Sequence, residues 1–323
     1  MRAVVFTGAG GSEVIALEER PDPTPGGGEV LVAVTHAGLN PADADQRKGN
    51  YPAPPGAPHD IPGLEVSGEV LACGPGVHDW KPGDRVFGLV GGGGLADRVL
   101  AHERQLTAVP AKLTPEQAAA IPEAFITAHD AVFSQAGLRM GETLLVHGAA
   151  GGVGNAAVQL GVAAGARVLG TVRSAAAADS VRAAGAEAVP DEDFADAVRE
   201  LTGGRGVDVI IELVGAPHFP GNLKAIATQG RITVVGIGAG GGIELPLGLL
   251  MRSRVTMRGT VLRARPLEQK AQAVRAFERE VVPQIASGAV AAQIDSIHPY
   301  ADAAAAFERL EGRGKLGKVL LAF

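Results

Sequence analysis

The chain has only one cysteine, and aromatic side chains make up only 4% of its 323 residues. Cys73 therefore has no partner for a disulfide within the chain, and a cysteine-based zinc site cannot form. This composition fits a reducing compartment, so we expect a cytoplasmic protein. Basic clusters are missing as well, because the formal net charge of -6 at pH 7 is spread along the chain. That distribution argues against nucleic acid and anionic membranes as partners and favours small molecules.

Charged residues are absent from one long stretch, Thr143–Ala166, which has 24 residues. A run of this length is long enough to cross a bilayer. Six glycines and the polar side chains of His147, Asn155 and Gln159 interrupt it, however. A buried strand followed by a buried helix explains this pattern better than a membrane span does.

The same stretch has the pattern of a dinucleotide-binding turn. Leu144–Val146 is predicted to be a buried parallel strand, and Val153–Ala164 has helical composition. A side chain at the middle glycine of such a turn would hold the backbone away from the phosphates, and the N–H groups of the helix start face the pyrophosphate. The alternative is a glycine-rich turn without a ligand. We assign to cofactor binding the residues at and beside the G-x-G-x-x-G positions, with alanine in the first: Ala149, Gly151, Gly152, Val153 and Gly154.

Two kinds of sequence pattern follow one another along the chain. Residues 1–122 alternate short β-type runs with Gly/Pro turns, and a Thr-x-x-Gln capping box at Thr114 predicts the start of a helical connector. From Gly141 onward strands alternate with helices, which is typical of a doubly wound parallel sheet. The predicted strands are Leu144–Val146, Arg167–Thr171, Ala188–Val189, Val207–Leu213, Ile232–Gly236 and Val255–Thr260.

The last part of the chain is predicted to return to the first domain. A long helical stretch is expected over Leu267–Ala286, and the final residues VLLAF have the composition of a strand. We therefore expect an α/β protein in which a Rossmann domain, 123–261, is inserted in a catalytic domain formed by 1–122 and 262–323. Ligands are expected in the cleft between the two domains.

The residues after the second predicted Rossmann strand bear on the choice of cofactor. NAD enzymes usually have an acidic residue there that binds the ribose 2′-hydroxyl, but this chain has Arg173 and Ser174. A cation and a hydroxyl suit a 2′-phosphate, so we expect NADPH, unless Arg173 is only a solvated surface charge. Asp191 and Glu192 would oppose a nearby phosphate, which leaves dual cofactor preference open.

Two further segments are candidates for cofactor contact. Gly236, Ile237 and Gly238 follow the fifth predicted strand at the carboxyl edge of the sheet, where backbone groups can meet the nicotinamide. Lys318, in the motif GKLGKV, is a weaker candidate, because exposed lysines are usually only solubilising.

Six motifs occur in one order along the whole chain: LNPADADQRKGNYPAPPG, IPGLEVSGEV, WKPGDRV, AAAIPEAFITAHDAVF, GAAGGVG and GRGKLGKVLL. Together they resemble the zinc-free quinone oxidoreductases of the medium-chain dehydrogenase/reductase superfamily. The resemblance implies a GroES-like, mainly β catalytic domain, a Rossmann domain and a homodimer. It also implies NADPH-dependent reduction of quinones.

The zinc alcohol dehydrogenases of the same superfamily need a cysteine near position 40 and a histidine in a G-H-E motif. This chain has Asn40 and Leu64 at those positions, and neither can replace a zinc ligand. We therefore expect catalysis without a metal. Hydride transfer then requires an acceptor that is already electron-poor, such as a quinone or a conjugated enone.

Three residues are expected to line the cleft at the nicotinamide: Asn40, Tyr51 and Thr127. Tyr51 matches the tyrosine of the family motif and is our candidate donor of a hydrogen bond to the carbonyl oxygen of the acceptor. Alternatively, this tyrosine only packs in a proline-rich loop. Asn40 is expected either to hold the nicotinamide ribose or the acceptor, or to be a turn residue. In the same segment, Asp43 and Arg47 form either an orienting pair or a surface turn.

The sequence leaves alternatives to an NADPH:quinone reductase. One is an NADPH-dependent reductase of activated C=C bonds in enals and enones, and another is a non-catalytic NADPH-binding sensor. For the homodimer that the resemblance implies, the strand predicted at Val255–Thr260 is the expected edge that pairs across a twofold axis.

Overall fold

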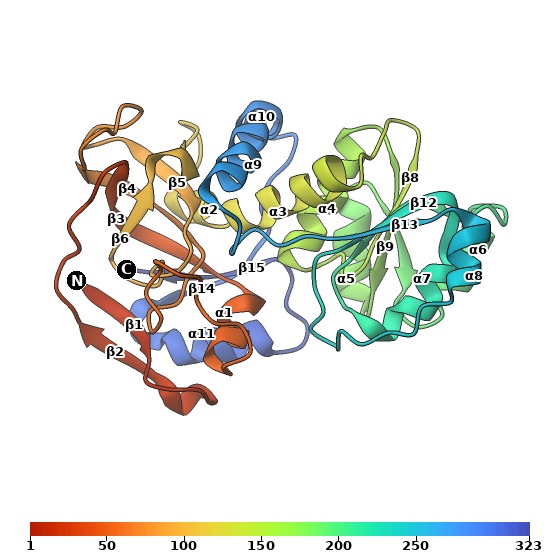
Figure 1. Ribbon diagram of the computed structural model, residues 1–323, viewed down its shortest axis with the longest axis horizontal. Helices are drawn as coiled ribbons and strands as arrows, with labels where there is room; N and C mark the ends of the chain where they lie inside the picture. Colours follow the sequence, from red (N-terminus) through yellow and green to blue (C-terminus); the bar gives the residue numbers. More distant parts are fainter. The chain divides into compact units, whose positions relative to one another are not determined.

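The computed structural model describes residues 1–323, which form two compact units (Figure 1). One unit consists of Met1–Ile126 and Leu262–Phe323, and the other of Thr127–Val261. None of the helices is both long and apolar enough to span a membrane. The expected limits of independently folding domains stay a prediction.

The first unit is built on a mixed sheet in which the last strand of the chain lies beside an early one. Its order is β14-β15-β3-β4-β5-β7, with β6 paired to β3, and β1 and β2 form a separate antiparallel pair. β15 pairs antiparallel with β3, so the predicted return of the C-terminal strand is confirmed. The strands are β1 Arg2–Phe6, β2 Ile15–Glu19, β3 Glu29–Leu39, β4 Glu65–Cys73, β5 Arg85–Leu89, β6 Arg98–His102, β7 Leu106–Ala108, β14 Ile294–Pro299 and β15 Lys318–Ala322.

Five α-helices and a π-helical turn belong to this unit. The helical connector is confirmed, because Thr114 accepts a hydrogen bond from Gln117 N and caps α2. The helical stretch expected over Leu267–Ala286 is confirmed and consists of two helices, α9 and α10, since Pro283 in the first turn of α10 has no N–H to continue α9. The helices are α1 Pro41–Arg47, α2 Pro115–Ala119, α9 Leu267–Glu280, α10 Val282–Ser287 and α11 Ala303–Glu311, and the π-helical turn is Pro122–Ile126.

The second unit has the predicted doubly wound architecture. Its six strands are all parallel, in the order β10-β9-β8-β11-β12-β13. In chain order this is 3-2-1-4-5-6, the arrangement of a Rossmann fold. The strands are β8 Thr143–Val146, β9 Arg167–Val172, β10 Glu187–Pro190, β11 Val207–Glu212, β12 Ile226–Val234 and β13 Thr256–Gly259.

Helices in the second unit connect these parallel strands (Figure 1). The uncharged stretch Thr143–Ala166 forms β8 and α4, and the side chains of Leu144, Leu145 and Val146 are fully buried. Continuous burial explains why these three consecutive positions of β8 are apolar. The helices are α3 Thr127–His129, α4 Gly152–Ala163, α5 Ala175–Ala183, α6 Phe194–Leu201, α7 Phe219–Ala225 and α8 Leu247–Ser253.

Candidate functional site

The turn between β8 and α4 is shaped by its glycines. Gly148 has a φ of 58°, in the left-handed region, and its carbonyl oxygen accepts a hydrogen bond of 3.0 Å from Gly151 N. A Cβ atom at Gly154 would lie 2.2 Å from Gly148 O, so only glycine fits there. A Cβ at Gly151 would approach no atom closer than 3.4 Å. The chain itself therefore leaves room at Gly151, and the close approach of a ligand there stays a prediction.

This turn lies at the topological switch point of the sheet. β8 has β9 on one side and β11 on the other. Ligands of doubly wound sheets bind at the carboxyl ends of the strands at such a point. Arg173 and Ser174 follow β9 at the same edge, and Ser174 caps α5 by accepting a hydrogen bond from Ala177 N. The structure therefore brings the glycine turn and these two residues to one edge of the sheet.

Gly236, Ile237 and Gly238 follow β12 at this carboxyl edge. A Cβ at Gly236 would lie 2.7 Å from Leu213 O, which requires glycine for packing within the chain. Ile237 is 58% exposed, and a Cβ at Gly238 would meet nothing within 4 Å. These two residues have the accessibility that contact with a ligand needs. Contact with the nicotinamide stays a prediction.

Behind the turn lies a buried polar network that sequence reasoning missed. His147 Nε2 is 2.6 Å from Asn222 Oδ1, and Asn222 Nδ2 donates to Glu212 Oε2 at 2.5 Å. On its other side, His147 Nδ1 is 3.2 Å from Thr171 Oγ1, which also accepts a hydrogen bond from Gly148 N. The network thus connects the carboxylate at the end of β11 to the first glycine of the turn.

The protonation of His147 follows from these contacts. Burial lowers the pKa of His147 to about 4, although the charge of Glu212 opposes the shift. Because Asn222 Nδ2 donates to Glu212, its Oδ1 faces His147, so the neutral ring donates from Nε2 to Asn222 Oδ1. One ligand atom from each of His147, Glu212 and His218 lies within 4.8 Å of the others, a spacing that a metal ion could use. Hydrogen bonds already occupy both nitrogens of His147 and both oxygens of Glu212, so we interpret the cluster as a hydrogen-bonded support for the turn.

In the first unit, Asn40 belongs to a buried ion-pair cluster. Lys318 Nζ lies 2.5 Å from Glu65 Oε1 and donates to Asn40 Oδ1 at 2.5 Å. Asn40 Nδ2 donates to the same Glu65 oxygen, and Glu65 Oε2 accepts from Glu123 N. Lys318 is only 4% exposed, so its interpretation as an exposed, solubilising lysine is wrong. Both ends of the Asn40 amide are engaged within the chain, and its contact with a cofactor or acceptor stays a prediction.

Asp43 and Arg47 do not form an orienting pair or a surface turn. Both side chains are buried. Asp43 accepts hydrogen bonds from Asn40 N and Gly63 N, whereas Arg47 pairs with Glu311 at 2.8 Å. Burial raises the pKa of Asp43 to about 6, against the two backbone hydrogen bonds. The charged side chains of this segment therefore hold α1 in place.

Tyr51 is held by a buried arginine that the sequence did not reveal. Arg263 donates to Tyr51 O at 3.3 Å and to Gln46 Oε1 at 2.5 Å, and its guanidinium carbon lies 5.3 Å from the centre of the Tyr51 ring. Burial raises the pKa of Tyr51, which the charge of Arg263 partly offsets. The hydroxyl of Tyr51 therefore stays protonated near neutral pH, as a hydrogen-bond donor must. Thr127, the third expected residue, begins α3 and is buried.

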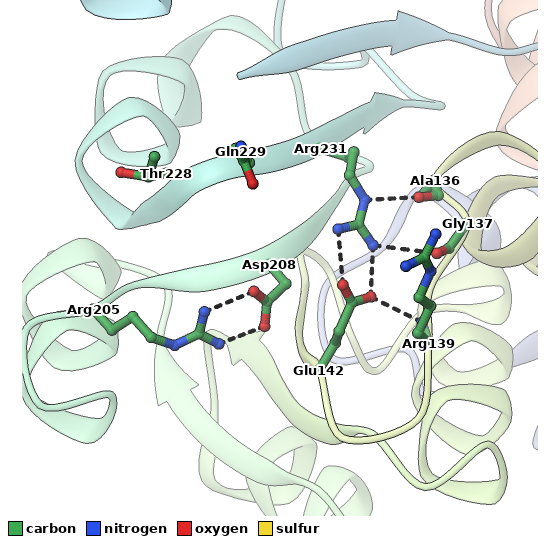
Figure 2. Close-up of a pocket in the computed structure, with 9 residues that line it drawn as sticks. All are labelled: Ala136, Gly137, Arg139, Glu142, Arg205, Asp208, Thr228, Gln229 and Arg231. Carbon is green, nitrogen blue, oxygen red and sulfur yellow. Dashed lines mark hydrogen bonds and ion pairs between the residues drawn. The ribbon is translucent and has the colours of Figure 1, made fainter. Parts of the chain in front are cut away.

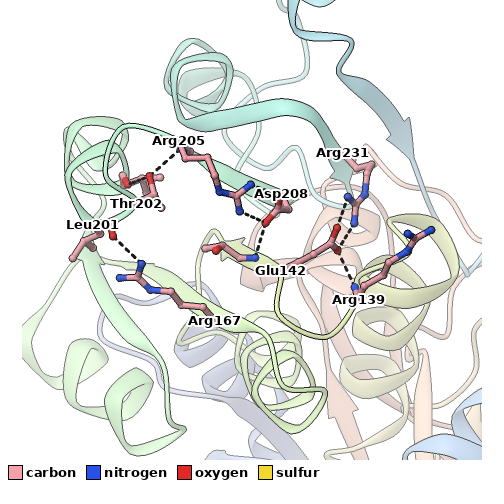
Figure 3. Close-up of polar contacts among 11 residues, drawn as sticks. Arg139, Glu142, Arg167, Leu201, Thr202, Arg205, Asp208 and Arg231 are labelled. Atoms are coloured by element: carbon pink, nitrogen blue, oxygen red, sulfur yellow. Dashed lines mark hydrogen bonds and ion pairs between the residues drawn. The ribbon is translucent and has the colours of Figure 1, made fainter.

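Ion pairs also line a pocket at the opposite, amino-terminal edge of the Rossmann sheet (Figure 2). Arg231 donates to both oxygens of Glu142, and Arg205 to both oxygens of Asp208 (Figure 3). Asp208 also accepts from Thr143 N at the start of β8. The hydrogen bond from Arg231 lowers the pKa of Glu142 despite burial. These contacts fix the starts of the strands, and none of the predicted site residues lies among them.

Two family models match the chain: the alcohol dehydrogenase GroES-like domain at residues 26–111, and the zinc-binding dehydrogenase at residues 152–279. The quinone oxidoreductase of Rattus norvegicus is 35% identical over 327 residues, which cover 99% of this chain and 97% of that protein. The structure of Escherichia coli quinone oxidoreductase complexed with NADPH is 29% identical, with a TM-score of 0.91 and full coverage of both chains. A structure named as an NAD-dependent alcohol dehydrogenase is 33% identical, with a TM-score of 0.88 and full coverage of both chains.

The buried Lys318–Glu65 pair makes a stability prediction. Lys318→Met leaves the Glu65 carboxylate buried without its cation, so we expect the free energy of unfolding to fall by about 3–5 kcal/mol. Glu65→Gln together with Lys318→Met removes both charges and should lose less than the sum of the single variants. Urea unfolding measures both, with the exposed Lys112→Met as the matched control. Equal, small losses for Lys318→Met and Lys112→Met would contradict the prediction.

Proposed function

Because the chain belongs to the zinc-free quinone oxidoreductases of the medium-chain dehydrogenase/reductase superfamily, we propose that it reduces quinones with NADPH. Family membership makes it a nicotinamide-dependent oxidoreductase. That NADPH is the cofactor and a quinone the acceptor is our proposal beyond family membership. The observation that carries this proposal is the carboxyl edge of the Rossmann sheet, where the glycine turn and the exposed cation of Arg173 lie together.

The residues at this edge fit the phosphates of NADPH. Gly151 leaves space for close approach, and the first N–H groups of α4, at Gly152, Val153 and Gly154, suit the pyrophosphate. Arg173 suits the 2′-phosphate through a charge-assisted contact, with Ser174 beside it. Bound NADPH supplies a hydride. We extend the proposed contacts with the cofactor to Ala149, Thr127, Asn40, Lys318 and the segment Gly236, Ile237 and Gly238.

The residues at the positions of the catalytic zinc ligands support a quinone as the proposed acceptor. Asn40 forms hydrogen bonds to Glu65 and Lys318, and Leu64 is buried, so this donor set does not fit zinc. An acceptor that needs no Lewis acid is a quinone, which takes up a hydride and one proton to become a hydroquinone. In this proposal the Tyr51 hydroxyl donates a hydrogen bond to the quinone oxygen on which negative charge develops.

A reductase of activated C=C bonds in enals and enones remains the second candidate, because a conjugated enone is also electron-poor. The same glycine turn and Arg173 would serve it. A non-catalytic NADPH-binding sensor would need only the residues at the carboxyl edge of the Rossmann sheet. The contact of the buried Arg263 with Tyr51 favours a catalytic role instead. We also propose that the protein works in the cytoplasm, in keeping with its single cysteine.

We propose that the protein forms a homodimer through the edge of the Rossmann sheet. β13 is the last strand of that sheet, and α8 has no buried residue. Leu247 and Met251 of α8 are 65% and 77% exposed. An open strand edge beside exposed large apolar side chains is a surface that a second copy can cover.

Initial rates with a panel of acceptors test the proposed reaction. We expect NADPH oxidation with 1,2-naphthoquinone, 9,10-phenanthrenequinone or 1,4-benzoquinone, and slower oxidation of NADH. An alkenal in the same panel separates the candidates, because turnover of the alkenal alone would favour the enone reductase. NADPH binding without turnover of any acceptor would favour the sensor.

Tyr51→Phe tests the hydrogen-bond donor. Removal of one donor to a developing oxyanion typically costs about 100-fold in rate, so we expect kcat for the quinone to fall by about tenfold or more. The KM for NADPH should stay unchanged. Tyr300→Phe is the matched control, since this other tyrosine of the chain donates to Ala3 O within the first unit. An unchanged quinone rate in Tyr51→Phe would remove the donor role.

Charged substitutions on α8 test the dimer. Sedimentation velocity should give a dimer for the unaltered protein and a monomer for Leu247→Asp combined with Met251→Asp. Met140→Asp is the control, because Met140 is 84% exposed and lies outside this edge. A monomeric unaltered protein, or a dimer that survives the α8 substitutions, would refute the proposed interface.

A further inference from the structure

An acidic side chain lies beside Arg173 at the carboxyl edge of the Rossmann sheet. β9 and β10 are paired, and Asp191 N donates a 3.0 Å hydrogen bond to Val172 O, the residue before Arg173. The charge of Arg173 acts on the carboxyl group of Asp191. A carboxylate at this place would repel a 2′-phosphate and would accept a hydrogen bond from a ribose 2′-hydroxyl. By itself, Asp191 therefore favours NADH over NADPH.

A buried histidine faces this carboxylate. His218 ends a short 3-10 turn after β11, and its Nε2 lies 3.4 Å from Asp191 Oδ1. The ring is 8% exposed and packs against the rings of His147 and Phe194, with centroids 4.4 and 5.2 Å away. Its Nδ1 is buried and has no hydrogen-bond partner. Packing thus fixes the ring so that Nε2 faces Asp191.

The charged groups around His218 come from several elements. Asp191 and Glu212 favour the imidazolium, Arg173 disfavours it, and His147 is neutral near pH 7 because its own pKa lies at about 4. Burial lowers the pKa of His218, but Asp191 and Glu212 outweigh it, so the pKa of His218 lies above its ordinary value. The hydrogen bond from His218 in turn lowers the pKa of Asp191 despite burial. The pair is therefore an ion pair below the raised pKa of His218.

We propose that His218 and Asp191 belong to the subsite for the cofactor's 2′ position and that protonation of His218 selects NADPH over NADH there. The imidazolium cancels the charge of Asp191, so that Arg173 acts on the 2′-phosphate without opposition. The neutral imidazole leaves the carboxylate uncompensated, which weakens NADPH and leaves NADH unaffected or stronger. This inference rests on the proposed use of NADPH.

The direction of the pH dependence follows from the raised pKa of His218. The imidazolium is present below that pKa and is lost as the pH rises through it, so NADPH affinity should fall towards pH 9. Since NADPH binds more tightly to the form with the imidazolium, we expect the preference for NADPH to decrease severalfold as the proton is lost. A 2′-phosphate, with a second pKa of about 6, is already largely a dianion at pH 7 and cannot cause a decrease above it.

Isothermal titration calorimetry of the full chain with NADPH and with NADH, from pH 7 to pH 9, tests this inference without relying on turnover. The quantity to compare is the ratio of the Kd for NADH to the Kd for NADPH. His218→Gln keeps a hydrogen-bond donor but has no charge, so its ratio should be low and independent of pH. Asp191→Asn removes the repulsion, so its ratio should be high at every pH. His59→Gln is the control, because the His59 side chain is 93% exposed.

The outcomes separate this inference from the proposed function. A ratio that falls with pH in the unaltered protein and in His59→Gln, but not in His218→Gln, supports the inference. NADPH preference that is constant with pH and unchanged in His218→Gln would overturn it while leaving the proposed function intact. Failure of the unaltered protein to bind NADPH would refute the proposed function itself. If His218→Gln does not fold, Asp191→Asn decides, and an unchanged ratio at pH 9 overturns the inference.

Discussion

The geometry of the turn at the carboxyl edge of the Rossmann sheet depends on the close approach of Gly154 to Gly148 O, where a Cβ would lie only 2.2 Å away. This contact lets α4 begin directly behind the turn, with its first N–H groups at the carboxyl edge of the sheet. A series of buried hydrogen bonds runs from Glu212 through Asn222 and His147 to Thr171. Thr171 Oγ1 accepts a hydrogen bond from Gly148 N and so ties the turn to this network. Because Glu212, Asn222, His147 and Thr171 each hydrogen-bond to the next, the network fixes the turn.

The first unit uses buried charge in a different way. The Glu65 carboxylate and the Lys318 ammonium join β4 to β15, and Asn40 at the end of β3 bonds to both. A buried pair of this kind is costly to desolvate but even more costly to break, so it favours one arrangement of the three strands. Asn40 stands at one position of a zinc ligand in the related alcohol dehydrogenases, and Glu65 follows the other. Both side chains form hydrogen bonds within the chain.

Local patterns were sufficient to predict the Rossmann strands, the glycine turn and the C-terminal strand, because each depends on neighbouring residues. They were not sufficient for the Lys318–Asn40 contact, whose partners are 278 residues apart and meet only through sheet pairing. For the same reason the sequence did not reveal the burial of His147 against Glu212 or of Arg263 against Tyr51. Helix α11 was not predicted either, but for a different reason. Its buried residues Ala303, Ala306, Phe307 and Leu310 have the spacing of an amphipathic helix, a signal that was present in the sequence.

Cofactor choice shows why a single surface residue is a weak guide. Arg173 is exposed, so solvent and salt screen its charge and limit what it contributes alone. Asp191 and His218 are more buried, so solvent and salt screen their charges less. The pair carries no net charge when His218 is protonated and a charge of -1 when His218 is neutral, so in this proposal it either leaves Arg173 unopposed or opposes it. Under this proposal, the preference for NADPH is set by the sum of three charges, of which the sequence pattern after β9 displays only one.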